Sequence, residues 1–156
     1  MDNSELCFLS AAELAPLIRK RTVSPVDIVK AHLERIEALN DALRAYLYIA
    51  GDQALATARA AEIDIVAGSY RGPLHGIPWG AKDIISVKGY KTTWGSAPFK
   101  DQVFDYDASA RGDFLRSAVS TRPCTVAPSA RLTAGAIRSP SITAVSRTTI
   151  LAPAFS

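Results

Sequence analysis

The sequence predicts an α/β protein with helices packed on a mixed sheet. Two stretches, at about residues 11–21 and 25–40, carry the apolar spacing of amphipathic helices, and a third begins near residue 52. After Gly68 the pattern changes to short apolar runs separated by glycine and proline, which is typical of strands and loops. A chain of 156 residues is long enough to build one domain with a core from these elements.

The first two helices carry clear start signals. Ser10 and Glu13 have the spacing of a capping box, in which each side chain bonds to the backbone of the other residue. Ser24 is placed as the N-cap of the second helix, and Pro25 fits its first position because that position needs no N–H donor. This second helix is expected to end near Asn40.

The following segments predict a short strand, a third helix and then strand or loop structure. Residues 44–50 are rich in tyrosine and aliphatic side chains and predict a strand. Asp52 is placed as the cap of the third helix, and Gly68 as its stop. The apolar runs at 77–79 and 84–87 lie between glycines and prolines, so they predict strand or loop structure.

The distribution of charge argues against a nucleic-acid partner. The net charge is +3, but residues 1–110 carry −2 and residues 111–156 carry +5, from six scattered arginines and one aspartate. A basic binding surface usually clusters lysine and arginine along one face. No apolar stretch is long enough to cross a bilayer and the first residues are acidic, so the sequence predicts a cytoplasmic protein without membrane contact.

Cysteine and histidine offer little material for a metal site or a disulfide framework. Cys7 and Cys124 have neither metal-ligand spacing nor the pattern of a disulfide scaffold. His32 lies on the apolar stripe of the second helix and is expected to be a partly buried structural residue. His75 lies in a glycine-rich turn and is expected to position the backbone or to lie at the surface. No metal or organic cofactor is expected.

The order of the sequence breaks down after about residue 109. Serine, threonine, alanine and proline make up 25 of the 46 residues from 111 to 156, and neither a helical nor a strand period persists there. Such a composition buries too little apolar area to offset the entropy of ordering. Residues 110–156 are therefore interpreted as a separate tail, either disordered or translated out of frame, and the second interpretation is favoured.

The block GPLHGIPWGAKD at Gly72–Asp83 resembles the lysine-bearing block of the amidase signature family. This family includes bacterial amidases and the A subunit of the aspartyl/glutamyl-tRNA amidotransferase. Asp107-Ala108-Ser109 is similar to the region that follows in these enzymes, so the resemblance covers about residues 8–109. It implies that residues 1–109 are an incomplete, truncated N-terminal part of the amidase-signature fold, helices on a mixed sheet.

The resemblance also implies a reaction: hydrolysis of the C–N bond of a small-molecule carboxamide by a Ser-Ser-Lys mechanism, without cofactor. Lys82 is then the catalytic lysine. A lysine can act as a base only when it is neutral, and its reference pKa of about 10.4 puts that form roughly 4–5 kcal/mol uphill at pH 7. Burial must close most of that gap.

The family's glycine- and serine-rich signature, which carries the nucleophile, is absent from the sequence. We therefore expect this chain to be inactive by itself. Two alternatives remain open, a non-enzymatic interaction module and a fragment of the A subunit of a tRNA-dependent amidotransferase. A further alternative concerns Lys82 and Asp83 alone, which could be a solvated surface pair.

Overall fold

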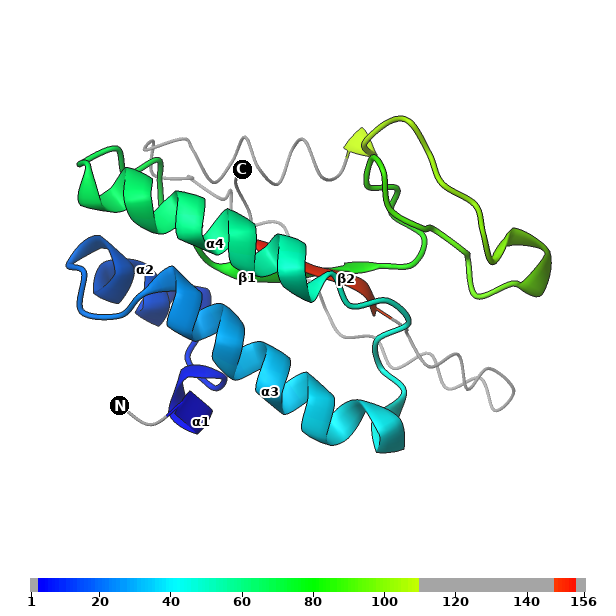
Figure 1. The fold of residues 1–156 in the computed structure, drawn as a ribbon, viewed down its shortest axis with the longest axis horizontal. Coiled ribbons are helices and arrows are strands. Elements are labelled where there is room, and N and C mark those ends of the chain that lie inside the picture. Colours follow the sequence, from blue (N-terminus) through cyan, green and yellow to red (C-terminus); the bar gives the residue numbers. More distant parts are fainter. Residues whose placement is uncertain (1–2, 110–147, 154–156) are drawn as a thin grey trace, which may run out of the picture.

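The computed structural model describes residues 3–109 and 148–153, and in them helices pack beside a two-stranded sheet (Figure 1). This arrangement confirms the α/β class. The elements in chain order are α1 (Asn3–Leu6), α2 (Ala11–Arg19), α3 (Pro25–Leu43), α4 (Gly51–Val66), β1 (Pro78–Lys82), the 3-10 helix η1 (Ala97–Phe99) and β2 (Thr148–Pro153).

The starts of α2 and α3 are the ones that the sequence predicts. The backbone N–H of Ser10 donates to Glu13 Oε2 at 2.8 Å, and the N–H of Glu13 donates to Ser10 Oγ at 3.3 Å, which completes the capping box. Ser24 Oγ accepts from the N–H of Val26 at 3.0 Å, and Pro25 is the first residue of α3. Both starts depend on side chains within three residues of the helix, so a local pattern suffices to predict them.

The end of α3 and the following connector differ from the prediction. The helix runs three residues past Asn40 and closes at Arg44, which adopts a left-handed conformation with φ of 48°. The side-chain amide of Asn40 then bonds to both backbone groups of Tyr46. Its Oδ1 accepts from the Tyr46 N–H at 2.8 Å, and its Nδ2 donates to the Tyr46 carbonyl at 3.1 Å. Residues 44–50 are thus a connector, and the predicted strand is wrong.

The start of α4 also differs from the prediction, whereas its end agrees with it. The N-cap is Ala50, which makes no side-chain capping bond, and Asp52 lies inside the first turn. The acidic side chain still suits that turn because the N-terminus of a helix is electropositive. After Val66 the chain turns at Gly68, which has φ of 90°. The Arg21 guanidinium donates to the carbonyls of Ile65 and Val66, at 3.2 and 3.0 Å, and so caps this end.

The sheet joins two segments that lie far apart in the sequence. β1 pairs with β2 in antiparallel register, from Pro78 opposite Pro153 to Lys82 opposite Thr148, with an irregularity between Ala81 and Lys82. The prediction of a tail without regular structure is therefore wrong for Thr148–Pro153. The rest of that tail lies outside the described residues. Residues 84–87 form a loop, one of the two structures predicted for them, and the N–H of Ile85 donates to the Lys82 carbonyl at 2.9 Å.

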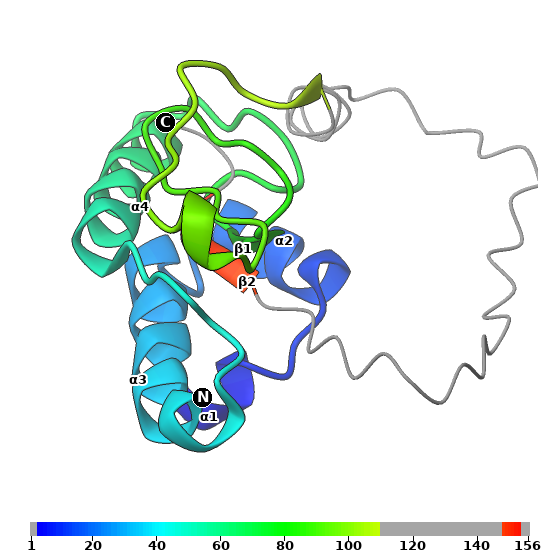
Figure 2. The same cartoon turned by 90° about the vertical axis from the view of Figure 1, so that its right-hand side faces the viewer.

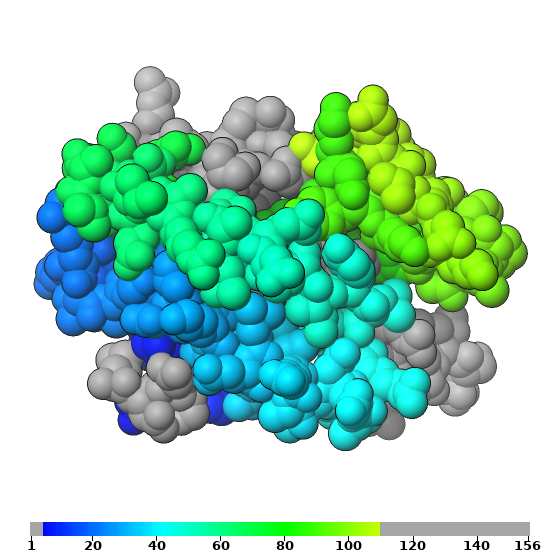
Figure 3. Space-filling view, viewed as in Figure 1, coloured from blue at the N-terminus to red at the C-terminus, as the bar shows by residue number. Residues whose placement is uncertain are grey.

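The core forms between the helices and against the residue that leads into β1. α3 and α4 lie side by side, and α4 also contacts β2 (Figures 1 and 2). Ile28 and Val29 of α3 are completely buried. Ile28 shares one apolar cluster with Ile18 of α2 and Ile77 before β1, whereas Val29 packs in a second cluster against alanines of α4. In the space-filling view α3 and α4 form one continuous face, and the segment after β1 lies at one end of it (Figure 3). None of the described helices is both long and apolar enough to cross a membrane.

Candidate active site

The block from Gly72 to Asp83 folds as a tight turn that leads directly into β1. The turn is closed by two backbone bonds, from His75 N–H to the Gly72 carbonyl at 2.9 Å and from Ile77 N–H to the Leu74 carbonyl at 3.1 Å. The His75 side chain is only 1% exposed, and its Nδ1 accepts from the N–H of Arg71 at 3.2 Å. Of the two roles expected for His75, the structure supports backbone positioning and excludes the surface position.

The burial of His75 makes its protonation unfavourable. Desolvation, and to a smaller extent the nearby Arg71 cation, lower the pKa of His75 below its usual value, while Asp64 opposes the shift. His32 has the structural role predicted for it, since its Nδ1 hydrogen-bonds to the Ile28 carbonyl at 2.8 Å within α3.

We expect His75→Gln to flatten the dependence of stability on acid pH. The unfolded histidine takes up a proton near pH 6.5, before the folded one does, so the wild-type chain loses stability as the pH falls from that value through the lower, folded pKa. Glutamine does not titrate and keeps an acceptor for the Arg71 N–H. Urea midpoints of both proteins at pH 7.5 and pH 5 measure the effect, and equal losses in the two proteins would contradict it.

Lys82 lies at the end of β1 and its side chain is exposed. Its ammonium makes no hydrogen bond or ion pair with any of the described residues. The pairing is irregular here, because Ala81 lies opposite Ile150 and Lys82 opposite Thr148, which leaves one extra residue in β2; irregularities of this kind are frequent beside active sites. The described part of the chain therefore presents this amine outward and does not supply the burial that a lysine base needs.

Asp83 has the opposite environment from its neighbour. Its side chain is 4% exposed, and its carboxylate accepts from the N–H of Thr93 at 2.6 Å, from the N–H of Gly95 at 2.9 Å and from the Thr93 hydroxyl. The interpretation of Lys82 and Asp83 as a solvated pair is wrong for Asp83. Reasoning from sequence missed this residue, because Asp83 lies in the turn after β1 and its donors, Thr93 and Gly95, lie further along the chain.

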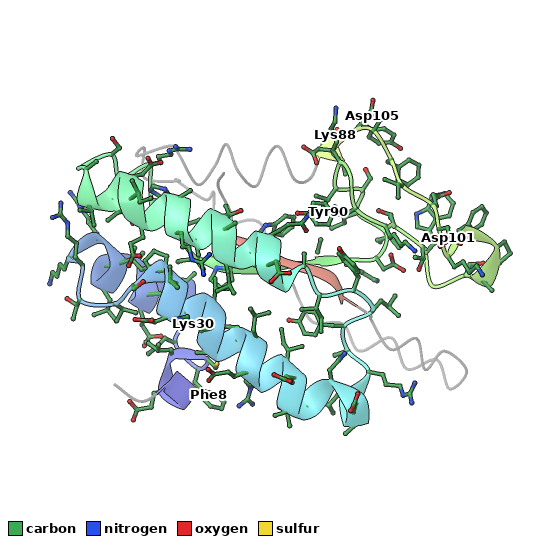
Figure 4. All side chains as sticks on the ribbon, viewed as in Figure 1. Phe8, Lys30, Lys88, Tyr90, Asp101 and Asp105 are labelled. Atoms are coloured by element: carbon green, nitrogen blue, oxygen red, sulfur yellow. The ribbon has the colours of Figure 1, made fainter. Side chains whose placement is uncertain are left out.

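The segment after Asp83 carries ion pairs on its surface. Lys88 pairs with Asp105 at 2.9 Å, and the two side chains lie together at the tip of this segment (Figure 4). Lys91 pairs with Asp101 at 2.8 Å. In the part of the chain that the structure describes, no three His, Cys, Asp or Glu side chains are grouped to hold a metal ion. Cys7 is a half-buried thiol, whereas Cys124 lies outside the described residues.

Together these features define an α/β protein with an exposed lysine at an irregularly paired strand end and a buried aspartate beside it. The Amidase family model matches residues 27–115, and the chain belongs to that family. It is 41% identical over 106 residues to the A subunit of the glutamyl-tRNA(Gln) amidotransferase of Acidothermus cellulolyticus, covering 68% of this chain and 21% of that protein. It is 38% identical over 109 residues to the putative amidase AmiD of Mycobacterium tuberculosis, covering 70% and 23%.

Solved structures agree with this family. A bacterial aryl acylamidase of the amidase signature family is similar with a TM-score of 0.63 and 28% identity, over 74% of this chain and 24% of that one. The peptide amidase of Stenotrophomonas maltophilia is similar with a TM-score of 0.64 and 30% identity, again over 74% and 24%. The chain spans about a fifth of the length of the curated relatives it matches.

Proposed function

We propose that residues 1–109 are the lysine-bearing part of an amidase domain that hydrolyses the C–N bond of small carboxamides, with Lys82 as the base. The observation that carries this proposal is the placement of Lys82, exposed at the irregularly paired end of β1 and followed by an anchored Asp83. An outward amine can be covered by other polypeptide, and such cover would supply the desolvation that a lysine base requires.

The proposed reaction needs a serine nucleophile in addition to this lysine. The chain contains serines, but none of them lies in the glycine- and serine-rich signature that carries the nucleophile in the family. In amide hydrolysis a serine oxygen attacks the carbonyl carbon, and a base must accept the serine proton and return it to the leaving amine. Donors must also stabilise the negative charge that develops on the carbonyl oxygen. The 156 residues contain no glycine- and serine-rich signature to provide these groups. We therefore propose that the chain by itself is inert.

A second candidate is that this chain corresponds to a segment of the A subunit of a glutamyl-tRNA amidotransferase. The 41% identity to such a protein supports it. The two candidates share Lys82 and the amide chemistry and differ in partners, because an amidotransferase of this kind works as a complex of several chains. Co-purification with the other subunits of an amidotransferase would favour this second candidate.

We predict that the purified chain hydrolyses no amide above the rate of buffer. The reason is that the sequence carries no glycine- and serine-rich signature to supply a nucleophile, while Lys82 is exposed. Product amines would be measured for a panel of aliphatic and aromatic carboxamides, with Lys82→Ala as the matched control. A rate that is present in the wild-type chain and lost in Lys82→Ala would contradict the prediction of inactivity, although it would support the role of Lys82.

A further inference from the structure

Asp83 accepts hydrogen bonds from several donors of a single turn, which lies about ten residues further along the chain. Its carboxylate accepts from the N–H groups of Thr93 and Gly95 and from the Thr93 hydroxyl, and its backbone carbonyl accepts from the N–H of Trp94 at 3.1 Å. Three consecutive backbone N–H groups thus converge on a single residue. Hydrogen bonds to a charged acceptor are stronger than neutral ones, and burial strengthens them further.

The turn held in this way has an unfavourable backbone conformation. Trp94 has φ of 56° and Gly95 has φ of 68°, both in the left-handed region. A tryptophan rarely adopts this region without support from its surroundings. The bonds to Asp83 provide such support, so we expect the turn to depend on that carboxylate.

We propose that Asp83 is a positioning residue for Lys82, an inference that rests on the proposed function. Lys82 lies between two constraints, the irregular pairing with β2 on one side and the anchored Asp83 on the other. Asp83 directly follows Lys82 in the turn after β1, where the Lys82 carbonyl accepts from the N–H of Ile85 at 2.9 Å, so the bonds to Asp83 help to fix the backbone from which the Lys82 side chain leaves. An amine that must meet a serine proton within hydrogen-bond distance requires such a defined direction.

The test uses the full chain and measures two quantities separately, the exchange of the backbone amides in the turn and the reactivity of the Lys82 amine. Asp83→Asn and Thr93→Val each remove part of the anchor, Thr93→Ser retains the hydroxyl donor, and Asp107→Asn is the control. Asp107 lies in the same segment and accepts from the Lys88 N–H at 2.9 Å, but it is exposed. Amide exchange reports on the turn, and limited acetylation with acetic anhydride, read by mass spectrometry as Lys82 relative to Lys30, reports on the lysine.

In Asp83→Asn we expect exchange of the Thr93 and Gly95 amides to accelerate about tenfold or more. The acetylation of Lys82 relative to Lys30 should change roughly twofold or more in either direction, while the amides of the α3 core keep their protection. Thr93→Val should show the same changes to a smaller degree. Thr93→Ser and Asp107→Asn should resemble the wild type.

An unchanged Lys82 ratio in Asp83→Asn would overturn the proposal, whether or not the turn is released. If Asp83→Asn fails to fold, Thr93→Val decides in the same way. Loss of core protection together with the turn in Thr93→Val as well would show that the anchor has only a general structural role, and would also overturn the proposal. Because acetylation does not depend on catalysis, this result stands even if Lys82 proves not to be a base.

Discussion

Replacing Lys82 with methionine in an active hybrid amidase is expected to lower kcat by about 10²–10⁴-fold, the usual contribution of a positioned base. In the hybrid, residues 1–109 replace the matching segment of the bacterial aryl acylamidase, whose fold this chain shares over 24% of that protein. Methionine keeps the length and the apolar stem of lysine but has no amine. The release of aniline from an aryl acylamide measures the rate.

Lys88→Met in the same hybrid is the control, because Lys88 is an exposed lysine of the same segment and is paired with Asp105. Its kcat should stay within about twofold of the parent hybrid. If the large hybrid is inactive, a graft of residues 72–83 alone serves instead, since it retains the lysine block. Equal rates for the Lys82 and Lys88 variants would contradict the assignment of Lys82 as the base.

Replacing Gly76 with alanine is expected to remove about 2–5 kcal/mol of stability, which combines overpacking with a left-handed backbone. Gly76 has φ of 85°, and a Cβ added there would lie 2.7 Å from Cγ and 2.9 Å from Cβ of the Pro25 ring. Pro25 is buried at the first position of α3, so it cannot move aside without disturbing that helix. Urea unfolding followed by circular dichroism measures the loss.

Gly68→Ala separates the cost of the left-handed backbone from the cost of overpacking. Gly68 has a similar φ of 90°, but a Cβ there would meet nothing within 4 Å. This variant should therefore lose only the backbone contribution, about 1–2 kcal/mol. Equal losses at the two glycines would show that the contact with Pro25 has no energetic weight.

The features that could be predicted from the sequence are those that depend on near neighbours in the chain. The capping box of Ser10 and Glu13 and the pair of Ser24 and Pro25 are formed within three residues, and both helix starts are where the sequence predicts them. Lys82 was identified through the resemblance of its twelve-residue block, not through its environment. The family assignment agrees with the match at residues 27–115, while the catalytic role of Lys82 and the domain boundary at residue 109 stay predictions.

The features that could not be predicted depend on residues that meet only in the folded chain. Asn40 holds Tyr46 and so turns an expected strand into a connector. His75 is buried by the packing of its turn. Asp83 is buried where it accepts hydrogen bonds from donors that lie ten residues or more further along the chain. β1 finds its partner about seventy residues further along, in a segment without strand periodicity. Local spacing therefore determined the starts of α2 and α3, and the resemblance of one block identified Lys82. Burial and long-range hydrogen bonding decided the surroundings of Lys82, because both depend on which distant groups come together.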